Sequence, residues 1–308
     1  MTWKLTLPCT RGEARALSNE NGEIGDLDPP PALMASEVDA ARPDTWRLDV
    51  YFENKPAAAA IALVRTLAPS AAGTAHVLER LDDEDWVTLS QDGLEPIREG
   101  RFFVHTPRHR ADVPEHAIAL EIDASRAFGT GQHATTACCL AMLDRSKSAG
   151  ARFSNICDLG TGTGLLAFGA LALWPNAHVI ASDIDPLAIE IARENAAVNG
   201  VPRGRGAGEI EFVTAAGLVH RRLKARAPYD LIVANILTKP LIDLAPAIAS
   251  AVAPGGTLIL AGLLDEQADR VAAAYRRRRF RLTDRITRER WTILNLVKRR
   301  PMPPSRRS

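Results

Sequence analysis

Three glycines spaced two residues apart follow a short apolar segment near the middle of the chain. The segment Ile156–Leu159 leads into Gly160, Gly162 and Gly164, and a further apolar stretch comes next. Glycines at this spacing let a strand turn sharply into a helix and let a ligand lie directly against the backbone. A second apolar segment ends at Asp183, whose carboxylate can accept two hydrogen bonds from a ribose. The pattern therefore predicts a strand–loop–helix–strand unit that binds a nucleoside-type cofactor.

The glycine loop is compatible with two cofactor-binding motifs. Gly162-Thr-Gly164-Leu-Leu-Ala167 matches the letters of the dinucleotide fingerprint, but its glycines fall one step late relative to the end of the strand. The other frame is an acid followed by x-Gly-x-Gly-x-Gly, with Asp158 as the acid. This frame resembles the first motif of class I S-adenosylmethionine-dependent methyltransferases, in which the acid holds the charged amino-acid end of the cofactor. It favours S-adenosylmethionine over NAD, and over a tight turn without a ligand.

The bulk composition places the chain among ordinary globular proteins. Its 308 residues are 46% hydrophobic and 24% charged, which predicts one or two domains with a substantial core. The formal net charge of +1 predicts no strong affinity of the whole chain for nucleic acid, so we expect no stable nucleic-acid binding. No apolar run approaches the ~20 residues of a membrane span, and the first residues lack a signal-peptide core. We therefore expect a cytoplasmic protein without membrane contact.

The cysteines indicate neither a metal site nor a disulfide framework. Cys9, Cys138, Cys139 and Cys157 contain no C-x-x-C pair, and the adjacent Cys138 and Cys139 are poor partners for each other. Cys157 lies in an apolar segment, where a cysteine behaves as a small hydrophobic residue. We expect no bound metal.

The composition changes near residue 108. Residues 1–108 contain the alternating segment 46–53, which is typical of a half-buried strand. We further expect strands at 4–7, 75–81 and 101–106, and helices at 11–19 and 56–67. This order predicts a small N-terminal α+β domain of ferredoxin-like type, joined by a linker at 109–122 to the second part.

The second part, residues 123–300, is regular. We expect strands at 156–159, 177–182, 210–214, 229–234, 257–261, 280–287 and 291–297, and helices at 165–174, 186–199, 219–225, 239–252 and 265–277. Strand–helix alternation predicts a parallel, doubly wound α/β sheet with ligands at the carboxyl ends of its strands. The last two strands are joined by a short polar turn, which predicts an antiparallel hairpin at one edge. By resemblance this is the Rossmann-like, seven-stranded class I methyltransferase architecture. Pro254–Gly256 is expected to be a turn, and residues 301–308 a basic, disordered tail.

Two further segments contain candidate site residues. In the first, residues 127–136 combine glycines, which let the backbone wrap a ligand, with hydroxyls before an expected helix; we expect Thr135 to cap this helix. In the second, Asn235 ends a buried strand, where an amide is costly unless its hydrogen bonds are satisfied. Asn-Pro-Pro-Tyr/Phe occupies this strand end in aminomethyltransferases. Asn235-Ile-Leu-Thr238 keeps the Asn but lacks the aromatic residue, which favours a flexible amine over a flat base as the methyl acceptor.

Together these motifs resemble the bacterial ribosomal protein L11 methyltransferase family, PrmA. The resemblance covers the second part of the chain and is weaker in the first. It is carried by Phe128-Gly-Thr-Gly-Gln-His-Ala-Thr-Thr136, Asp158-Leu-Gly-Thr-Gly-Thr-Gly164, Asp183-Ile-Asp-Pro186, Glu194-Asn-Ala-Ala-Val-Asn-Gly200, Asn235-Ile-Leu237 and Leu244-Ala-Pro246. The chain departs from the usual family residues at Ala134 (Pro), Thr161 (Cys) and Thr238 (Ala).

The resemblance implies a protein N-methyltransferase. S-adenosylmethionine would be the cofactor, and the acceptors would be lysine ε-amino groups and the N-terminal α-amino group of ribosomal protein L11. The first domain would be a mobile substrate-recognition module. The residues implied in cofactor binding are Thr136, Asp158, Gly160, Gly162, Asp183 and Asn235, with Asn235 also catalytic. The alternatives are a methyltransferase acting on another protein amine or a small molecule, an NAD-binding dehydrogenase, and a catalytically silent adaptor.

Two basic segments have no role in this scheme. Arg276–Arg279 follows an expected helix end, where cations suit the helix dipole, and residues 298–308 are also rich in arginine. A transient contact with the ribosome is the alternative for both.

Overall fold

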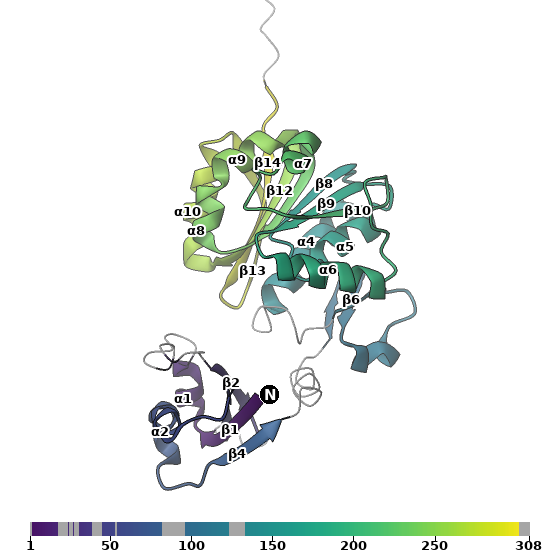
Figure 1. Cartoon of the computed structure of the whole chain (residues 1–308). Helices are drawn as coiled ribbons and strands as arrows, with labels where there is room; N and C mark the ends of the chain where they lie inside the picture. Colours follow the sequence, from purple (N-terminus) through teal and green to yellow (C-terminus); the bar gives the residue numbers. More distant parts are fainter. Residues whose placement is uncertain are drawn as a thin grey trace, which may run out of the picture. The chain divides into compact units, whose positions relative to one another are not determined.

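The computed structural model describes residues 2–17, 24, 27, 31–38, 45–52, 54–81, 96–122 and 133–301. The chain divides into two compact units, residues 1–93 and residues 94–308. Figure 1 shows the elements of both units.

The first unit has the ferredoxin-like order of strands and helices. Its elements are β1 (Thr2–Cys9), α1 (Arg11–Ala16), β2 (Ala32–Glu37), β3 (Trp46–Phe52), α2 (Ala58–Leu67), the 3-10 helix η2 (Pro69–Ala71) and β4 (Val77–Leu81). The strands pair antiparallel in the order β2-β3-β1-β4. Leu5, Leu48 and Val50 of the sheet are fully buried together with Val64 of α2. The predicted α+β type is confirmed, and β2 is a strand that the sequence did not indicate.

The boundary between the units lies earlier than the predicted residue 108. Residues 94–122 belong to the second unit and contain β5 (Ile97–Glu99), β6 (Phe102–His105), the 3-10 helix η3 (Pro107–Asp112) and β7 (Ile118–Glu121). These strands form a separate sheet in the order β5-β6-β7.

Packing explains why residues 109–122 are part of the second unit and not a linker. Phe102 and Leu120 are buried in the same hydrophobic cluster as Leu140 and Leu166. The side chain of Asn199 accepts a hydrogen bond from the backbone N–H of Glu121 at 2.7 Å and donates to its carbonyl at 2.7 Å.

The second unit is built on a seven-stranded sheet. Its helices are α4 (His133–Ser148), α5 (Leu165–Leu173), α6 (Pro186–Val198), α7 (Arg221–Arg226), α8 (Thr238–Asp243), α9 (Ala245–Ala251) and α10 (Asp265–Arg276). Its strands are β8 (Asn155–Leu159), β9 (His178–Asp183), β10 (Ile210–Thr214), β11 (Tyr229–Asn235), β12 (Val252–Leu264), β13 (Phe280–Arg288) and β14 (Trp291–Lys298). The strand order is β10-β9-β8-β11-β12-β14-β13. The first five strands in this order are parallel, and β14 pairs antiparallel with both β12 and β13, as the sequence predicts.

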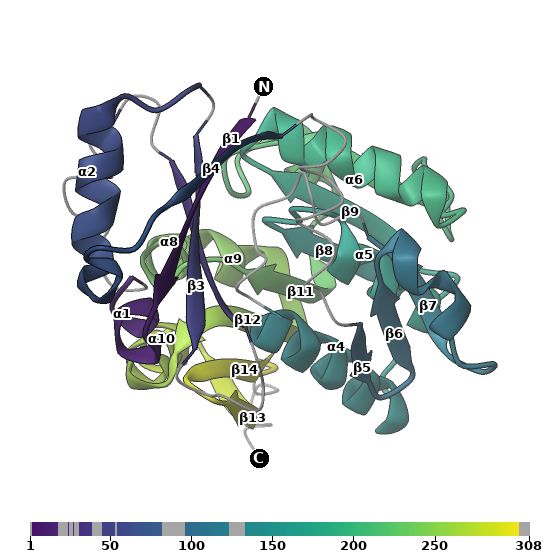
Figure 2. The same cartoon turned by 90° about the horizontal axis from the view of Figure 1, so that it is seen from below.

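Helices cover both faces of this sheet. Buried residues of α4, α5 and α6 form one hydrophobic cluster with the sheet, and buried residues of α7, α8, α9 and α10 form another. Figure 2 shows the two sets of helices on opposite sides of the strands. A three-layer arrangement of this kind brings the loops after the parallel strands to one edge of the sheet.

Two local predictions are wrong. The expected single helix over residues 239–252 is two helices, because Pro246 near the start of α9 has no backbone N–H to continue α8. The expected turn Pro254–Gly256 lies within β12, at an irregularity where Tyr229 pairs with Val252 and Leu231 pairs with Thr257.

All four cysteines are free and buried. Burial raises the pKa of the Cys157 thiol, which is the behaviour of a core residue. In the part of the chain that the structure describes, no helix is long and apolar enough to span a bilayer, and no three His, Cys, Asp or Glu side chains gather as metal ligands.

Candidate active site

The glycine loop leaves the end of β8 in a conformation that only glycine adopts without strain. Gly160, Gly162 and Gly164 have φ angles of 75°, 54° and 88°. A Cβ at Gly160 would collide with the side chain of Ile236, so this glycine is also needed for space. The backbone N–H groups of Gly160 and Thr161 donate to the carbonyl of Ser182 at 2.7 and 3.0 Å, which ties the loop to the neighbouring β9.

Asp158 lies beneath this loop and is 1% exposed. Its Oδ2 accepts hydrogen bonds from Thr161 Oγ1 at 2.6 Å and from the Ala167 N–H at 3.1 Å. Its Oδ1 is buried without a partner among the described residues. Burial raises the pKa of Asp158 to about 7, because the two hydrogen bonds offset only part of the desolvation of the charged form. A cationic group brought to Oδ1 would restore the ionised form.

Asp183 ends β9 on the other side of the loop and holds two backbone segments. Its Oδ2 accepts from the Gly162 N–H at 2.9 Å and its Oδ1 from the Asp185 N–H at 3.1 Å. A carboxylate has about four lone-pair positions, so each oxygen keeps one for a further donor. The side chain is thus fixed at the loop and still able to accept the two hydroxyls of a ribose.

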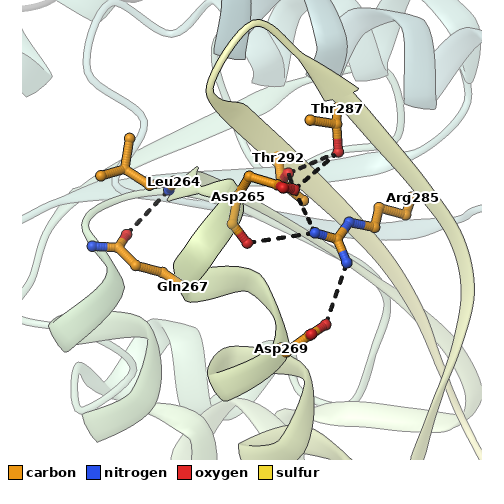
Figure 3. Close-up of polar contacts among 7 residues, drawn as sticks. All are labelled: Leu264, Asp265, Gln267, Asp269, Arg285, Thr287 and Thr292. Atoms are coloured by element: carbon orange, nitrogen blue, oxygen red, sulfur yellow. Dashed lines mark hydrogen bonds and ion pairs between the residues drawn. The ribbon is translucent and has the colours of Figure 1, made fainter.

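Asn235 ends β11 and has the same kind of unsatisfied atom as Asp158. Its Oδ1 is buried and has no partner within the described ranges. The following Ile236 is held by the close approach of Gly262, where a Cβ would collide with the Ile236 backbone. The start of α8 is held as well, because Thr238 Oγ1 donates to Gln267 Oε1 at 2.5 Å. The same Gln267 oxygen accepts from the Leu264 N–H at 3.1 Å (Figure 3).

These strand ends surround a cavity of about 450 Å³. Gly160, Asp183, Asn235 and Trp291 all form part of its wall. The cavity wall therefore combines the backbone of the glycine loop, a carboxylate, and an asparagine whose amide oxygen has no partner among the described residues. This combination suits an adenosine-type ligand whose reactive end lies beside Asn235.

Comparison with known proteins identifies the type of enzyme that has this site. The family model described as Ribosomal protein L11 methyltransferase (PrmA) matches residues 26–299. The chain belongs to the PrmA family. It is 42% identical over 265 residues to the "Ribosomal protein L11 methyltransferase" of Brucella abortus (strain S19), over 86% of this chain and 89% of that protein.

A second relative and a solved structure agree with this assignment. The protein of the same name from Rhizobium etli is 43% identical over 265 residues, covering 86% of this chain and 88% of the relative. The crystal structure of the ribosomal protein L11 methylase from Lactobacillus delbrueckii subsp. bulgaricus superposes with a TM-score of 0.58 at 26% identity, over 67% of this chain and 100% of that one. Membership of the PrmA family favours the methyltransferase alternative over the dehydrogenase.

The structure brings three of the six sequence-predicted site residues to the cavity wall. Gly160, Asp183 and Asn235 form part of this wall, and Asp158 and Gly162 do not. Asp158 is joined to the glycine loop by the hydrogen bond from Thr161, and the Gly162 N–H donates to the wall residue Asp183. Thr136 is half-buried in the first turn of α4 and is not part of the wall that the described residues define. The segment 123–132, which includes the predicted Phe128–Gly131 loop, lies outside the described residues. Thr135 is the third residue of α4, so its predicted role as a helix cap is wrong, because α4 begins at His133.

Two departures from the usual PrmA residues make hydrogen bonds in this chain. Thr161 donates to Asp158, and Thr238 donates to Gln267. An alanine at residue 238 could not make this hydrogen bond, and a cysteine at residue 161 would be a weaker donor. Thr238 therefore adds a hydrogen bond near the cavity, and Thr161 provides a stronger donor to Asp158 than a cysteine would.

Trp291 is the wall residue that sequence reasoning missed. It is the first residue of β14, which runs antiparallel to the other strands and so begins at the edge where they end. An aromatic residue directly after the hairpin turn was the available signal. Arg290 holds this turn, because its carbonyl accepts from the Asp265 N–H at 2.9 Å.

A polar cluster around Asp265 fixes the hairpin that carries Trp291 (Figure 3). Asp265 Oδ1 accepts from Thr292 Oγ1 at 2.8 Å and from Arg285 Nη2 at 2.5 Å. The hydrogen bond from Thr292, followed by that from Arg285, lowers the pKa of Asp265. The carboxylate thereby joins the start of α10 to both strands of the hairpin, and it positions Trp291 without reaching the cavity itself.

Proposed function

We propose that this protein transfers methyl groups from S-adenosylmethionine to ribosomal protein L11 in the cytoplasm, and that the acceptors are lysine ε-amino groups and the N-terminal α-amino group. The observation that carries the proposal is a pair of buried oxygens that have no partner among the described residues: Asp158 Oδ1, whose carboxylate is bonded to the glycine loop, and Asn235 Oδ1, whose residue forms part of the cavity wall. Membership of the PrmA family supports the choice of cofactor and of substrate.

The residues present fit the cofactor. Asp158 would hold its ammonium group, directly or through water, because the orphaned Oδ1 is an acceptor in a site too buried for an isolated charge. Gly160 would let its methionine portion approach the backbone, and Asp183 would accept its ribose hydroxyls. When bound, S-adenosylmethionine supplies an electrophilic methyl group on a cationic sulfonium. Thr136 and Gly162 would complete the binding site from α4 and from the loop.

Asn235 would position the acceptor amine. A lysine with a reference pKa of about 10.4 must lose a proton before it can attack, at a cost of roughly 4 kcal/mol near neutral pH. The cavity lowers this cost, because an apolar wall that includes Trp291 and Pro240 disfavours the charged ammonium. The Asn235 Oδ1 atom would accept an N–H of the neutral amine and direct its lone pair along the line of transfer. None of the described residues that line the cavity is a strong base, so the proton would leave through water.

The first unit, residues 1–93, is proposed to recognise the substrate. Its ferredoxin-like fold contains none of the residues proposed to bind the cofactor, so its role is separable from the chemistry. Hydrogen exchange of the full chain with and without L11 would test this. New protection in β1–β4 and their helices is expected, and protection confined to residues beyond 93 would contradict the assignment.

The decisive experiment is intact-mass spectrometry of purified L11 after incubation with the full chain and S-adenosylmethionine. Mass gains in methyl units establish the reaction, and peptide mapping assigns them to lysines and to the N-terminus. Cofactor binding by calorimetry without a mass gain would retain the methyltransferase and remove the substrate. Gains at other residue types would contradict the amine assignment.

A further inference from the structure

Helix α6 makes a side-chain contact with the glycine loop that the proposed function does not use. The Asn195 side chain belongs to a residue that is 4% exposed, and its Nδ2 donates to the backbone carbonyl of Thr163 at 3.0 Å. Thr163 lies between Gly162 and Gly164, in the half of the loop that leads into α5. Asn195 is not a residue of the cavity wall. It therefore contacts the cofactor loop without reaching the space that the cofactor would fill.

A second asparagine of α6 bonds to the neighbouring three-stranded sheet. Asn199 follows Asn195 by four residues, a spacing that places two side chains on the same side of a helix. Its amide exchanges two hydrogen bonds of 2.7 Å with the backbone of Glu121, which ends the edge strand β7. The same Nδ2 donates to the Asn195 carbonyl at 2.8 Å. The two asparagines thus connect Thr163 of the glycine loop to Glu121 of β7.

Packing of α6 does not explain why residue 195 is an asparagine. The other buried residues of α6 are isoleucines and alanines, and a buried amide is costly unless it is hydrogen-bonded. The bond that Asn195 makes goes to the one loop residue that has positive-φ glycines on both sides, with φ angles of 54° at Gly162 and 88° at Gly164. Glycines leave a backbone many accessible paths, so a fixed partner at Thr163 selects one of them.

The other half of the glycine loop is held independently of α6. The N–H groups of Gly160 and Gly162 donate to groups of β9 at 2.7 and 2.9 Å. These contacts remain when Asn195 is changed. Loss of the Asn195 amide should therefore loosen the loop around Thr163 and leave its attachment to β9 in place.

We propose that Asn195 is a positioning residue for S-adenosylmethionine, and that Asn199 acts through it. Asn195 holds Thr163 so that the loop keeps the shape in which it receives the cofactor, and Asn199 fixes α6 to β7. A loop that is already ordered loses less conformational entropy when a ligand binds, so cofactor affinity depends on this side chain outside the cavity wall. The identity of the cofactor rests on the proposed function.

The test is calorimetry of the full chain with S-adenosylmethionine and with S-adenosylhomocysteine, together with hydrogen exchange and thermal unfolding without ligand. Asn195→Ala should weaken binding of both ligands on the order of tenfold, because the loop loses a buried hydrogen bond. In the ligand-free protein it should speed exchange of the N–H groups around Thr163, while exchange in β9 stays as it is.

Asn195→Asp keeps the size of the side chain and tests the donor alone. Its ionised carboxylate has no proton to give to the Thr163 carbonyl, whereas a protonated carboxyl can donate again. Its loss of affinity relative to the unmodified protein at the same pH should therefore shrink as the pH is lowered. This recovery also keeps the test valid if Asn195→Ala does not fold.

Asn155→Ala is the matched control. The Asn155 Nδ2 also donates to backbone carbonyls, those of Arg226 and Pro228 at 2.6 and 2.9 Å. Asn155 begins β8, at the opposite end of the strand from the glycine loop. This variant should lower the unfolding temperature as Asn195→Ala does, and it should leave both dissociation constants unchanged.

Asn199→Ala tests the second step of the proposal. Alone it should weaken binding of both ligands a few-fold. In the Asn195→Ala background it should cause no further loss, because the connection to the loop is already broken. Losses that multiply in the double variant would show that Asn199 does not act through Asn195.

Two outcomes would overturn the role of Asn195. One is binding of both ligands by Asn195→Ala and Asn195→Asp with the affinity of the unmodified protein. The other is an equal loss in Asn195→Ala and Asn155→Ala, which would report general destabilisation. If the unmodified protein itself binds neither ligand, the cofactor of the proposed function is lost, and this inference is lost with it.

Discussion

Two aspartates with the same burial have opposite surroundings in the two units. Asp49 in β3 of the first unit and Asp158 in β8 of the second are each 1% exposed. Both oxygens of Asp49 have partners: Thr6 Oγ1 at 2.7 Å and Lys4 Nζ at 3.5 Å on Oδ1, and Arg47 Nε at 2.9 Å on Oδ2. Asp158 has two donors on one oxygen and none on the other among the described residues.

The difference distinguishes two kinds of buried carboxylate. The fold itself supplies the hydrogen-bond and charge partners of Asp49, whereas a ligand would have to supply the missing partner of Asp158. A buried carboxylate without a cationic partner is costly, so a fold retains one only where something else supplies the charge. An unsatisfied atom alone is not sufficient, because Thr106 Oγ1, Ser182 Oγ and Asn295 Oδ1 are also buried without partners among the described residues, and none of these residues forms part of the cavity wall. The informative combination is an unsatisfied amide or carboxylate oxygen on a residue that either lines the cavity, as Asn235 does, or is bonded to the glycine loop, as Asp158 is.

The largest expected effect is at Asn235. Asn235→Ala should lower kcat for L11 methylation on the order of 100-fold, because the acceptor amine loses its positioning contact. The dissociation constant for S-adenosylmethionine should change only a few-fold. Single-turnover kinetics and calorimetry measure the two quantities.

Asn295→Ala is the matched control for Asn235→Ala. It removes an equally unsatisfied amide oxygen from β14, away from the cavity, and should leave kcat unchanged. Equal losses of kcat in the two variants would show that the position of the unsatisfied oxygen, in the cavity wall or elsewhere, does not matter for catalysis.

The next effect concerns stability and is expected in the first unit. Asp49→Asn should destabilise this unit by about 3 kcal/mol, because the buried Lys4 ammonium loses its nearer counter-charge and keeps only the half-exposed Glu79 at 4.0 Å. Urea denaturation followed by the fluorescence of Trp3 and Trp46 would measure it. Asp158→Asn is the comparison variant and should cause no loss of stability without ligand, because the folded protein already disfavours the charged form of Asp158. A large loss there would mean that Asp158 is a structural residue like Asp49.

Asp158→Asn should instead weaken cofactor binding. Loss of a charged hydrogen bond to the cofactor's ammonium group costs about 1.5–3 kcal/mol, or roughly 10- to 100-fold in the dissociation constant. Calorimetry with S-adenosylmethionine and with S-adenosylhomocysteine measures this change. Unchanged affinity for both ligands would remove Asp158 from the binding site.

The raised pKa of Asp158 gives a pH dependence with a definite sign. Burial raises this pKa from 3.8 to about 7, so between these values the folded protein keeps a proton that the unfolded chain releases. Stability without ligand should therefore fall as the pH rises through this window and level off above about pH 7. Cofactor affinity should rise with pH up to about pH 7, by at most about tenfold per unit, because the ligand's ammonium requires the ionised carboxylate. In Asp158→Asn the rise should disappear; a profile that persists would assign it to another group.

The sequence predicted the sheet and most of the site because both depend on local patterns. The strand–helix alternation, the glycine loop after Leu159 and the acid at the end of β9 follow from short-range spacing, and the structure has them near the expected residues. Asn235 was also recognisable, as a polar residue that ends a buried strand.

Features that depend on distant contacts were not predictable in this way. The boundary between the units is set by Phe102 and Leu120, which pack into a core made mostly of later residues. The amino-acid composition around Phe102 and Leu120 does not indicate this packing. Trp291 reaches the cavity because β14 is antiparallel and the cluster around Asp265 fixes its hairpin. The contrast between Asp49 and Asp158 was also hidden, because it depends on which side chains arrive from other strands.

The smallest expected effect extends the comparison from side chains to the backbone. Arg279 has a φ of 68°, which costs a non-glycine residue about 1 kcal/mol, so Arg279→Gly should stabilise the second unit by about that amount. Arg277→Gly is the matched control; its φ of −62° is ordinary, so the added freedom of the unfolded chain should destabilise the unit slightly. Thermal unfolding should thus shift in opposite directions in the two variants. A gain at Arg279→Gly would mean that the fold does not need this arginine, as it does not need an open oxygen on Asp158. A loss would show that the Arg279 side chain, which donates to the Arg300 carbonyl, stabilises the unit by more than its backbone conformation costs.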